Sequence, residues 1–334
     1  MILWLKLLIC LVVIAYAGYN LSRYGDIIAE KTGMSGSWVG LILLATATSL
    51  PELVTGVSSV TVADAPDIAV GNALGSTVFN SAILIILDAL YKRETLYSSA
   101  AQGHILSAAL GGLMIGFAGF SLLLDSAGMS PVFGHVGLYT PFFVLIYFVA
   151  VRAVHKYEQR LHDAYTEASV ERYPGVTLKK AITGFSLAAA TVVATGIWLP
   201  FVAKDIAELM GWGESFVGTL LVAGVTSAPE VVVTVSALRI GALDMAIANV
   251  LGSNLFNIIY LAVDDLFYTQ GPLLANVNSA HAITAFTSVM MSALVIVGFI
   301  YRPQQRAILK LTWISLGLFV LYILNTWVQF QYGQ

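Results

Sequence analysis

Long apolar runs dominate this chain, and short polar stretches separate them. A run of about 20 apolar residues is long enough to cross the hydrocarbon core of a bilayer as a helix. Because lipid excludes open sheet edges and irregular backbone, the pattern predicts an all-α polytopic membrane protein. We predict ten transmembrane helices, at residues 3–30, 36–61, 67–90, 102–124, 133–152, 179–209, 214–239, 243–267, 280–300 and 307–330.

The second apolar run is interrupted near its centre. The segment LLATATSLPELVTG, residues 43–56, places Pro51 and Glu52 in an otherwise apolar helix. Proline has no backbone N–H, so the carbonyl of Ala47 loses its helical partner. Irregular backbone at this depth is tolerated only where it lines a protected cavity. The segment therefore predicts a span that is broken at mid-membrane beside a polar site.

The interrupted segment returns in the second half of the chain. LATATSLPELVTGVSS (44–59) is echoed by VAGVTSAPEVVVTVSA (222–237), at an offset of 178 residues. DIAVGNALGSTVFN (67–80) is echoed by DMAIANVLGSNLFN (244–257), at an offset of 177. Each half holds five predicted spans, so the second half is inverted in the membrane, as in many secondary transporters. The expected architecture is two inverted five-helix repeats with helices 2 and 7 broken at mid-membrane.

Composition and charge agree with this plan. The chain is 58% hydrophobic and 10% charged, against roughly 25% charged in an average soluble domain. The loops after the odd-numbered spans, with their helix ends, hold fourteen of the sixteen Lys and Arg residues. The positive-inside rule makes that side cytoplasmic and puts both termini outside, in a plasma membrane. We expect repeats at 1–158 and 175–334, joined by a linker at 159–174 within a cytoplasmic polar segment, 153–178.

Oxygen donors gather around the two breaks. Thr48 and Ser49 precede Glu52 by four and three residues, on one helix face. The next span carries a stripe of Asn72, Ser76 and Asn80 at steps of four. These are hard oxygen donors without thiolate or imidazole, a set that suits Ca²⁺ or Na⁺. The second half repeats the pattern with Thr226, Ser227, Glu230, Asn249, Ser253 and Asn257.

Simpler interpretations exist for each feature. Proline kinks occur in ordinary membrane helices, and a buried lysine can neutralise an intramembrane acid. The nearest basic residue to Glu52 in sequence, however, is Lys31, 21 positions away, and intramembrane acids are functional by default. Asn72 and Asn249 serve equally well in helix packing, and the spacing of Gly71 and Gly75 is typical of close helix packing.

Two other groups of polar residues have plain structural interpretations. Asp88 and Asp265 are equivalent in the two repeats. We interpret them either as residues at solvated helix ends or as a negatively charged vestibule that concentrates cations. The five histidines show no metal-ligand spacing such as HExxH, so we expect them in loops or at helix ends.

The repeated segments resemble the α-repeats of the sodium/calcium exchanger family, within the cation/Ca²⁺ antiporter superfamily. The shared signature is G-T-S-x-P-E followed by G-N-x-x-G-S-N-x-x-N/D, in regions 44–90 and 222–267. The resemblance implies that Glu52 and Glu230 are the central Ca²⁺ carboxylates, shared with Na⁺. It further implies oxygen ligands from Thr48, Ser49, Thr226, Ser227, Ser76 and Ser253, backbone carbonyls of Ala45 and Ala223, and central positions for Asn80 and Asn257.

The chain departs from the family pattern at three points. Ala47 and Val225 replace the glycine before T-S, and Thr77 replaces the Asn after G-S in the first half. Asn257 stands where exchangers often carry Asp, which leaves two carboxylates instead of three. Two negative charges balance one Ca²⁺, whereas three Na⁺ would leave one net positive charge.

We therefore expect a secondary active antiporter that exchanges Na⁺ for Ca²⁺ by alternating access. Spans 1 and 6 would slide across a core of spans 2, 3, 7 and 8. The alternative is a Ca²⁺/cation antiporter coupled to H⁺ or dependent on K⁺. We expect no cofactor, no nucleic acid and no obligate protein partner beyond the transported ions and the lipid bilayer.

Two other classes fit the sequence less well. A cation channel usually builds its ring of oxygens from several subunits, whereas the repeat completes one site within one chain. An intramembrane protease would carry G-x-G-D, or G-x-S-x-G with a histidine, and neither motif is present. The chain is therefore not expected to be an enzyme.

Overall fold

The computed structural model describes residues 2–32, 47–92, 94–129, 131–162, 173, 175–239, 241, 243–307 and 310–333. Nearly all of this chain is helical, which confirms the all-α class. The first half contains α1 (Ile2–Lys31), α3 (Leu50–Thr61), α4 (Pro66–Leu90), α5 (Leu96–Ser99), α6 (Gly103–Ser126) and α7 (Tyr139–His162). The second half contains α8 (Leu178–Met210), α9 (Glu214–Val217), η1 (Gly218–Val222), α10 (Ala223–Thr226), α11 (Ala228–Arg239), α12 (Leu243–Phe267), η2 (Leu273–Asn276), α13 (His281–Tyr301) and α14 (Trp313–Tyr332).

Most helix ends in the described residues fall within a few residues of the predicted spans, with three exceptions, and the predicted start of the second span at 36 lies outside the described residues. A small hairpin of β1 (Val132–Phe133) and β2 (Val136–Gly137) occupies the predicted start of the fifth span, so that prediction was wrong. Helix α14 starts at Trp313 instead of 307, because the side chain of Thr312 caps it by accepting from the Ser315 N–H. The polar segment expected at 153–178 begins as helix, since α7 continues to His162.

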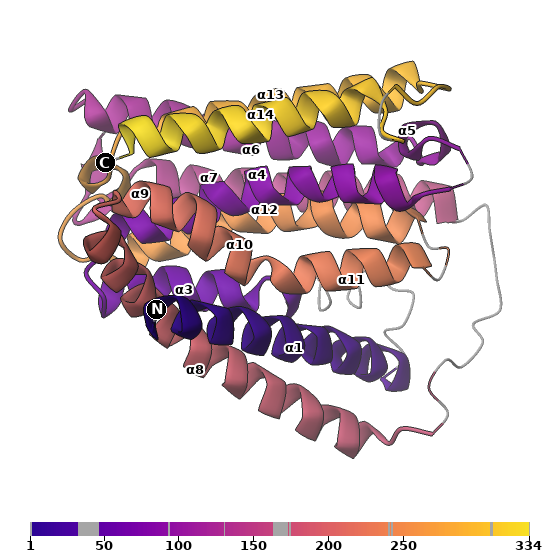
Figure 1. Ribbon diagram of the computed structural model, residues 1–334, viewed down its shortest axis with the longest axis horizontal. Helices are drawn as coiled ribbons and strands as arrows, with labels where there is room; N and C mark the ends of the chain where they lie inside the picture. The colour runs from indigo at the N-terminus through magenta and orange to yellow at the C-terminus, as the bar shows by residue number, and fades with distance from the viewer. Residues whose placement is uncertain are drawn as a thin grey trace.

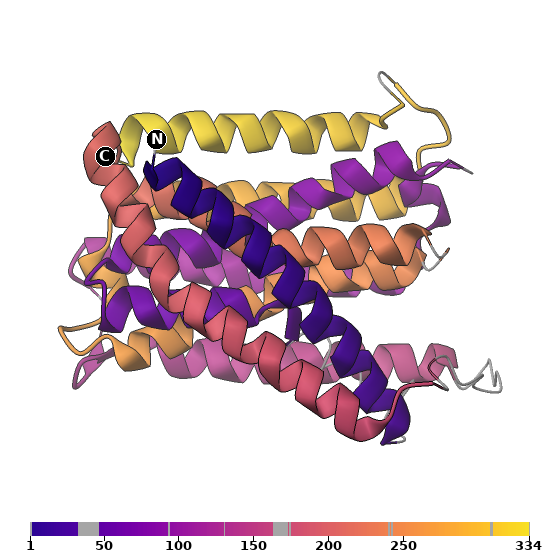
Figure 2. The ribbon, with the colours of Figure 1, turned by 60° about the horizontal axis from the view of Figure 1, so that its bottom comes forward.

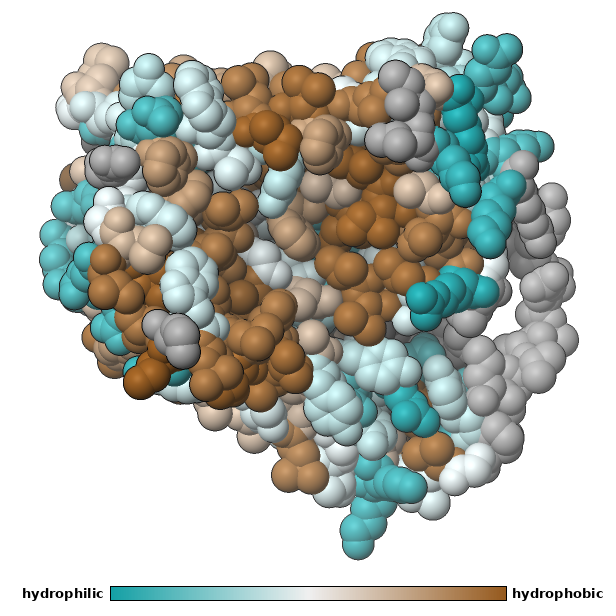
Figure 3. All heavy atoms as spheres, viewed as in Figure 1, coloured by the Kyte–Doolittle hydropathy of each residue, from teal (hydrophilic) through white to brown (hydrophobic). Residues whose placement is uncertain are grey.

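Within the described ranges, seven helices are long and apolar enough to cross a membrane, or eight if the bent pair Glu214–Thr226 and Ala228–Arg239 is one span. The apolar part of α7, Tyr139–Val154, is shorter. Figure 3 shows the consequence on one face, where apolar side chains form a central region and hydrophilic side chains gather toward the two ends of the helices. This distribution is what a bilayer-embedded bundle requires.

The helices form a bundle that two long helices cross on one face. Figures 1 and 2 show α1 and α8 side by side, running obliquely over the remaining helices. Helices α4 and α12 contact each other, and α6, α13 and α14 pack around them. Both termini lie at the same end of the molecule (Figure 1).

Glycines allow the closest approaches between these helices. A Cβ on Gly71 would lie 2.9 Å from the Thr219 nitrogen, and one on Gly75 would lie 2.4 Å from the Thr219 oxygen. The predicted role of this glycine pair in close packing is therefore confirmed, against the π-helical turn η1. In the same way α1 contacts the first turn of α11, since a Cβ on Gly18 would lie 2.3 Å from the ring of Pro229.

Asp88 and Asp265 are fully buried, so both interpretations of them, as solvated helix ends and as a vestibule, were wrong. Each carboxylate accepts hydrogen bonds from another part of the chain and fixes the start of a distant helix. Asp88 accepts from the Thr312 N–H at 2.7 Å and from the Ser315 hydroxyl at 2.7 Å. Asp265 accepts from Gly137 N–H at 3.0 Å, Tyr139 Oη at 2.7 Å, Thr140 Oγ1 at 2.5 Å and Leu273 N–H at 2.7 Å.

Two histidine–aspartate pairs repeat the same principle at the other helix ends. His281 Nε2 lies 2.9 Å from Asp67 Oδ1, and His104 Nε2 lies 3.0 Å from Asp244 Oδ1. Both histidines lie in the first turn of a helix, α13 and α6 respectively, as the sequence predicts for helix-end residues. Each pair joins one half of the chain to the other at equivalent positions.

Replacing Asp265 by alanine should destabilise the fold. The Asp265→Ala substitution leaves four buried donors without an acceptor, at a cost of at least about 3 kcal/mol in the free energy of unfolding. We expect a clear fall in the apparent melting temperature of the detergent-solubilised protein. The control is Asp205→Ala, which removes an exposed acid from α8. Equal melting temperatures in the two variants would contradict the proposed anchoring role.

Candidate ion-binding site

The chain turns at Ser49 and bends at Ser227, inside the two segments where the sequence predicts breaks. In the first half a turn at Ser49 precedes α3, and Pro51 lies in the first turn of that helix. In the second half α10 ends at Thr226, α11 starts at Ala228, and the two segments are bent by 44°. The serines have nearly the same backbone conformation, with φ −95° and ψ 10° at Ser49 and φ −82° and ψ 8° at Ser227.

Each serine contacts the glutamate of the opposite half. Ser49 Oγ donates to Glu230 Oε1 at 3.1 Å, and Ser227 Oγ donates to Glu52 Oε1 at 3.1 Å. The sequence placed Ser49 on the same face as Glu52 in its own helix, whereas the structure pairs it across the repeat. The two halves therefore meet at these serines and glutamates.

The following helix of each half adds a second serine to this contact. Ser76 Oγ on α4 lies 3.0 Å from Ser227 Oγ, and Ser253 Oγ on α12 lies 3.4 Å from Ser49 Oγ. One helical turn further along these helices lie Asn80 and Asn257, each 1% exposed. Since residues four apart share a helix face, the asparagines extend the same polar stripe.

The site contains buried polar atoms that no described residue satisfies. Glu52 is 2% exposed and Glu230 is fully buried, and the Oε2 atom of each has no hydrogen-bond partner in the described chain. Asn80 Oδ1 and Asn257 Nδ2 also lack partners there. Among the described residues neither glutamate pairs with a basic side chain. Buried, unpaired carboxylates of this kind require a cation or a proton.

The remaining predicted ligands lie close to this centre. Thr226 Oγ1 donates to Asn72 Oδ1 at 2.8 Å, and its side chain lies near Glu52. Thr48 occupies the equivalent place beside Glu230. The Ala223 carbonyl accepts the Ser227 N–H at 3.0 Å and is engaged within the helix.

One predicted ligand lies beyond what the structure describes, and two asparagines have structural partners. Ala45 lies outside the described residues, so the role of its carbonyl stays a prediction. Asn72 Nδ2 donates to the Glu52 carbonyl at 3.1 Å, and Asn249 Nδ2 donates to Thr234 Oγ1 at 3.0 Å. These bonds favour helix packing as the role of Asn72 and Asn249.

Sequence reasoning missed Tyr260, which also faces the site. Its side chain is 5% exposed and lies near Ser49 and the two glutamates. The available signal was its spacing, since Tyr260 follows Asn257 by three residues and Ser253 by seven, on the same face of α12. An aromatic residue in an apolar helix gave no chemical reason to single it out.

The arrangement is suited to hard cations. In the part of the chain described here, no group of three or more His, Cys, Asp or Glu side chains is placed to hold a metal ion. The donors are two carboxylates surrounded by neutral hydroxyl and amide oxygens, as Na⁺ and Ca²⁺ prefer. A helical membrane bundle with such a site between two equivalent halves belongs to the class of cation transporters.

Comparison with known proteins identifies the family. The model of the sodium/calcium exchanger protein family matches residues 2–154 and 180–331, so the chain belongs to this family. It is therefore a transporter of the cation/Ca²⁺ exchanger type. The family resemblance noted in the sequence is confirmed, and the gap in the match falls on the segment that joins the two halves.

Individual relatives cover most of the chain. It is 25% identical to the sodium/calcium exchanger MaX1 of Methanosarcina acetivorans, over 96% of this chain and 99% of that protein. It is 24% identical to the inner membrane protein YrbG of Escherichia coli, over 80% of each chain. Among solved structures, the fold is shared with YfkE, with TM-score 0.65, 16% identity and coverage of 97% and 92%, and with the exchanger NCX_Mj, with TM-score 0.61, 22% identity and coverage of 96% and 95%.

Binding of Ca²⁺ at this site should stabilise the purified protein. A ligand that binds only the folded state adds about 2.7 kcal/mol at a concentration of 100 times its Kd. We expect Ca²⁺ to raise the melting temperature of the wild type in Na⁺-free detergent, and Glu52→Gln to remove this shift. The matched control is Glu208→Gln, which neutralises an exposed acid on α8. A full Ca²⁺ shift in Glu52→Gln would place the ion elsewhere.

Proposed function

We propose that this protein is a secondary active antiporter that exchanges Na⁺ for Ca²⁺ across the plasma membrane by alternating access. The observation that carries the proposal is the crossed pair Ser49–Glu230 and Ser227–Glu52, with one unsatisfied carboxylate oxygen on each glutamate. Two carboxylates match the charge of one Ca²⁺, and the surrounding neutral oxygens suit both ions. The relative in Methanosarcina acetivorans is named a sodium/calcium exchanger, and the one in Escherichia coli an inner membrane protein.

The architecture we propose is two inverted repeats of five spans, 1–158 and 175–334. The seven long helices and the bent pair become ten spans when α7 and α3 are each counted as one more span. Contacts between helices support the repeat because they occur in equivalent pairs. The contact of α3 with α8 corresponds to that of α11 with α1, and the contacts of α4 with α13 and α14 correspond to those of α12 with α6 and α7.

Alternating access would involve α1 and α8, the first spans of the two halves. They lie together on one face of the bundle (Figure 2) and contact the two helices that carry the glutamates, α11 and α3. The close approach of Gly18 to Pro229 places α1 directly on one break. Sliding of this pair would open the site toward one side at a time while the crossed serine–glutamate contacts stay assembled.

The two carboxylates also give a reason for obligatory exchange. An unfilled site would carry two uncompensated negative charges through a poorly solvated environment, which is costly. The protein therefore changes the side to which the site is open readily only when the site holds cations. Three Na⁺ would leave one net positive charge on the two glutamates. Of the two loaded states, the Na⁺ complex therefore has the less favourable electrostatic energy.

A transport assay tests the proposal and separates it from coupling to H⁺ or K⁺. Purified protein is reconstituted in liposomes preloaded with Na⁺, with K⁺, or with only a proton gradient, and uptake of ⁴⁵Ca²⁺ is measured. We expect uptake that requires internal Na⁺, persists in Glu208→Gln, and falls at least about tenfold in Glu52→Gln and Glu230→Gln, because each loses half of the site's charge. Uptake driven by a proton gradient without Na⁺ would overturn the Na⁺ coupling.

Restoring a third acid at the centre should change how the protein handles Ca²⁺. Asn257→Asp places a carboxyl one turn from Ser253, with little change in side-chain volume. Added negative charge should raise the apparent affinity for Ca²⁺ by about tenfold, which corresponds to 1.4 kcal/mol, and should slow Ca²⁺ release. The Ca²⁺ dependence of the initial exchange rate measures this effect. An unchanged half-saturating concentration would show that Asn257 does not face the ion.

A further inference from the structure

A further buried acid lies two helical turns from the proposed central site. Asp264 on α12 is 1% exposed, and neither of its carboxylate oxygens has a hydrogen-bond partner in the described chain. Its neighbour Asp265 is fully engaged as a helix anchor, so the two adjacent acids have different environments. A buried carboxylate without a partner is not explained by structural anchoring.

Its position relates it to the central site. Asp264 follows Asn257 by seven residues, two helical turns along the same face of α12. It meets α3 at Gly56, which follows Glu52 by one turn: a Cβ at Gly56 would lie 2.5 Å from Asp264 Oδ2 and 2.7 Å from Oδ1. The carboxylate therefore lies against the backbone of α3, one step outward from the glutamate.

Contacts at the ends of α3 and α12 show toward which end of the molecule Asp264 lies from the central site. Beyond Asp264, Gln270 Nε2 donates to Asp64 Oδ1 at 2.9 Å, just past the end of α3. Nearby, Lys204 Nζ of α8 donates to the Ala63 carbonyl at 3.3 Å. Figure 1 shows both termini at this same end of the molecule. Asp264 thus lies between the site and the end that carries the termini.

The second half alone carries this acid. The repeat equivalent of Asp264 is Leu87, which is fully buried in an apolar cluster, and the equivalent of Gly56 is Thr234. At one of the two equivalent positions, the facing residue is therefore Gly56, and its lack of a side chain leaves space for the Asp264 carboxylate. The crossed serine–glutamate contacts are symmetric, whereas this position is not.

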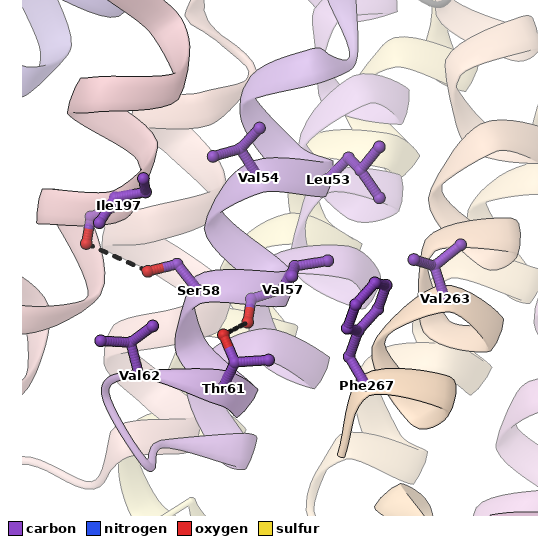
Figure 4. A pocket seen from close by; sticks show the side chains of 9 residues that line it. All are labelled: Leu53, Val54, Val57, Ser58, Thr61, Val62, Ile197, Val263 and Phe267. Atoms are coloured by element: carbon purple, nitrogen blue, oxygen red, sulfur yellow. Dashed lines mark hydrogen bonds between the residues drawn. The ribbon is translucent and has the colours of Figure 1, made fainter. Parts of the chain in front are cut away.

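A neighbouring hollow does not explain the acid. An apolar hollow of about 390 Å³ lies between α3, α8 and α12. Figure 4 shows Val263 and Phe267 of α12 on one of its walls. Its hydroxyls are engaged, since Ser58 Oγ donates to the Ile197 carbonyl at 3.1 Å and Thr61 Oγ1 to the Val57 carbonyl at 2.6 Å. The hollow therefore offers a cation no free side-chain donor among its described residues.

We propose that Asp264 forms an outer cation position, where a Na⁺ or Ca²⁺ is held in transit between the central site and the end with both termini. This inference rests on the proposed function. The negative charge attracts a hard cation, and water completes a coordination shell that such ions commonly keep in part. The centre has Asn257 in place of a third acid, whereas Asp264 provides an acid two helical turns outward, toward one side only.

The test compares Asp264→Asn with Asp205→Asn in right-side-out and inside-out membrane vesicles. Asparagine keeps the volume of the side chain and removes its charge, and Asp205 is an exposed acid at the same end of the protein. We expect Asp264→Asn to raise the half-saturating Ca²⁺ concentration by about tenfold from the side of the termini, since a focused charge raises local ion concentration by that order. The value from the opposite side should stay unchanged, as should the Ca²⁺-dependent thermal shift.

Three results would overturn this inference. Unchanged half-saturation from both sides would show that no ion stops at Asp264. An equal loss from both sides with a lower melting temperature would assign the residue a purely structural role. Unchanged values for Ca²⁺ and Na⁺, with altered dependence on external pH, would assign it to a proton. Because the readout is the sidedness of Ca²⁺ saturation, it stays informative if the coupling ion is not Na⁺.

Discussion

Two carboxylates buried at the same depth of a membrane bundle are the constraint on which the rest of this structure depends. Glu52 and Glu230 repel each other and lack basic partners in the described chain, so their separation and orientation must be fixed by neutral groups. The structure does this by giving each glutamate a serine from the other half. Neither half can make these contacts alone, because each one joins a serine of one half to a glutamate of the other.

The same crossed arrangement holds the ends of the helices. Asp88 of the first half fixes the start of α14, Asp265 of the second half fixes the start of α7, and the two histidine–aspartate pairs do the same for α13 and α6. Every one of these bonds joins the halves, so the central helices behave as one interlocked unit. Helices α1 and α8 are not fixed by these pairs, which is why the proposed motion involves them and leaves the ion site intact.

The sequence allowed the helices, and the bend at Ser227, to be predicted because both follow from local physics. Bilayer thickness sets the length of the apolar runs, and a proline breaks its own helix wherever the chain folds. The hairpin at 132–137 was missed because Val132 and Phe133 are as apolar as helix residues. The anchoring roles of Asp88 and Asp265 were missed because most of their partners lie more than 100 residues away. For the same reason the sequence placed Ser49 with Glu52, whereas the fold pairs it with Glu230.

A site built from two equivalent halves presents the ion with similar surroundings from either side of the membrane. Any difference in affinity between the two sides must then arise from positions where the repeats differ. Gly56 and Asp264, against Thr234 and Leu87, form such a position, and it adds one negative charge along only one route. A charge there cannot change the equilibrium that the ion gradients set, because it stabilises the ion equally on arrival and on departure. It can change the half-saturating ion concentration measured from that side. A carrier with a symmetric central site can thereby have different half-saturating concentrations on the two sides of the membrane.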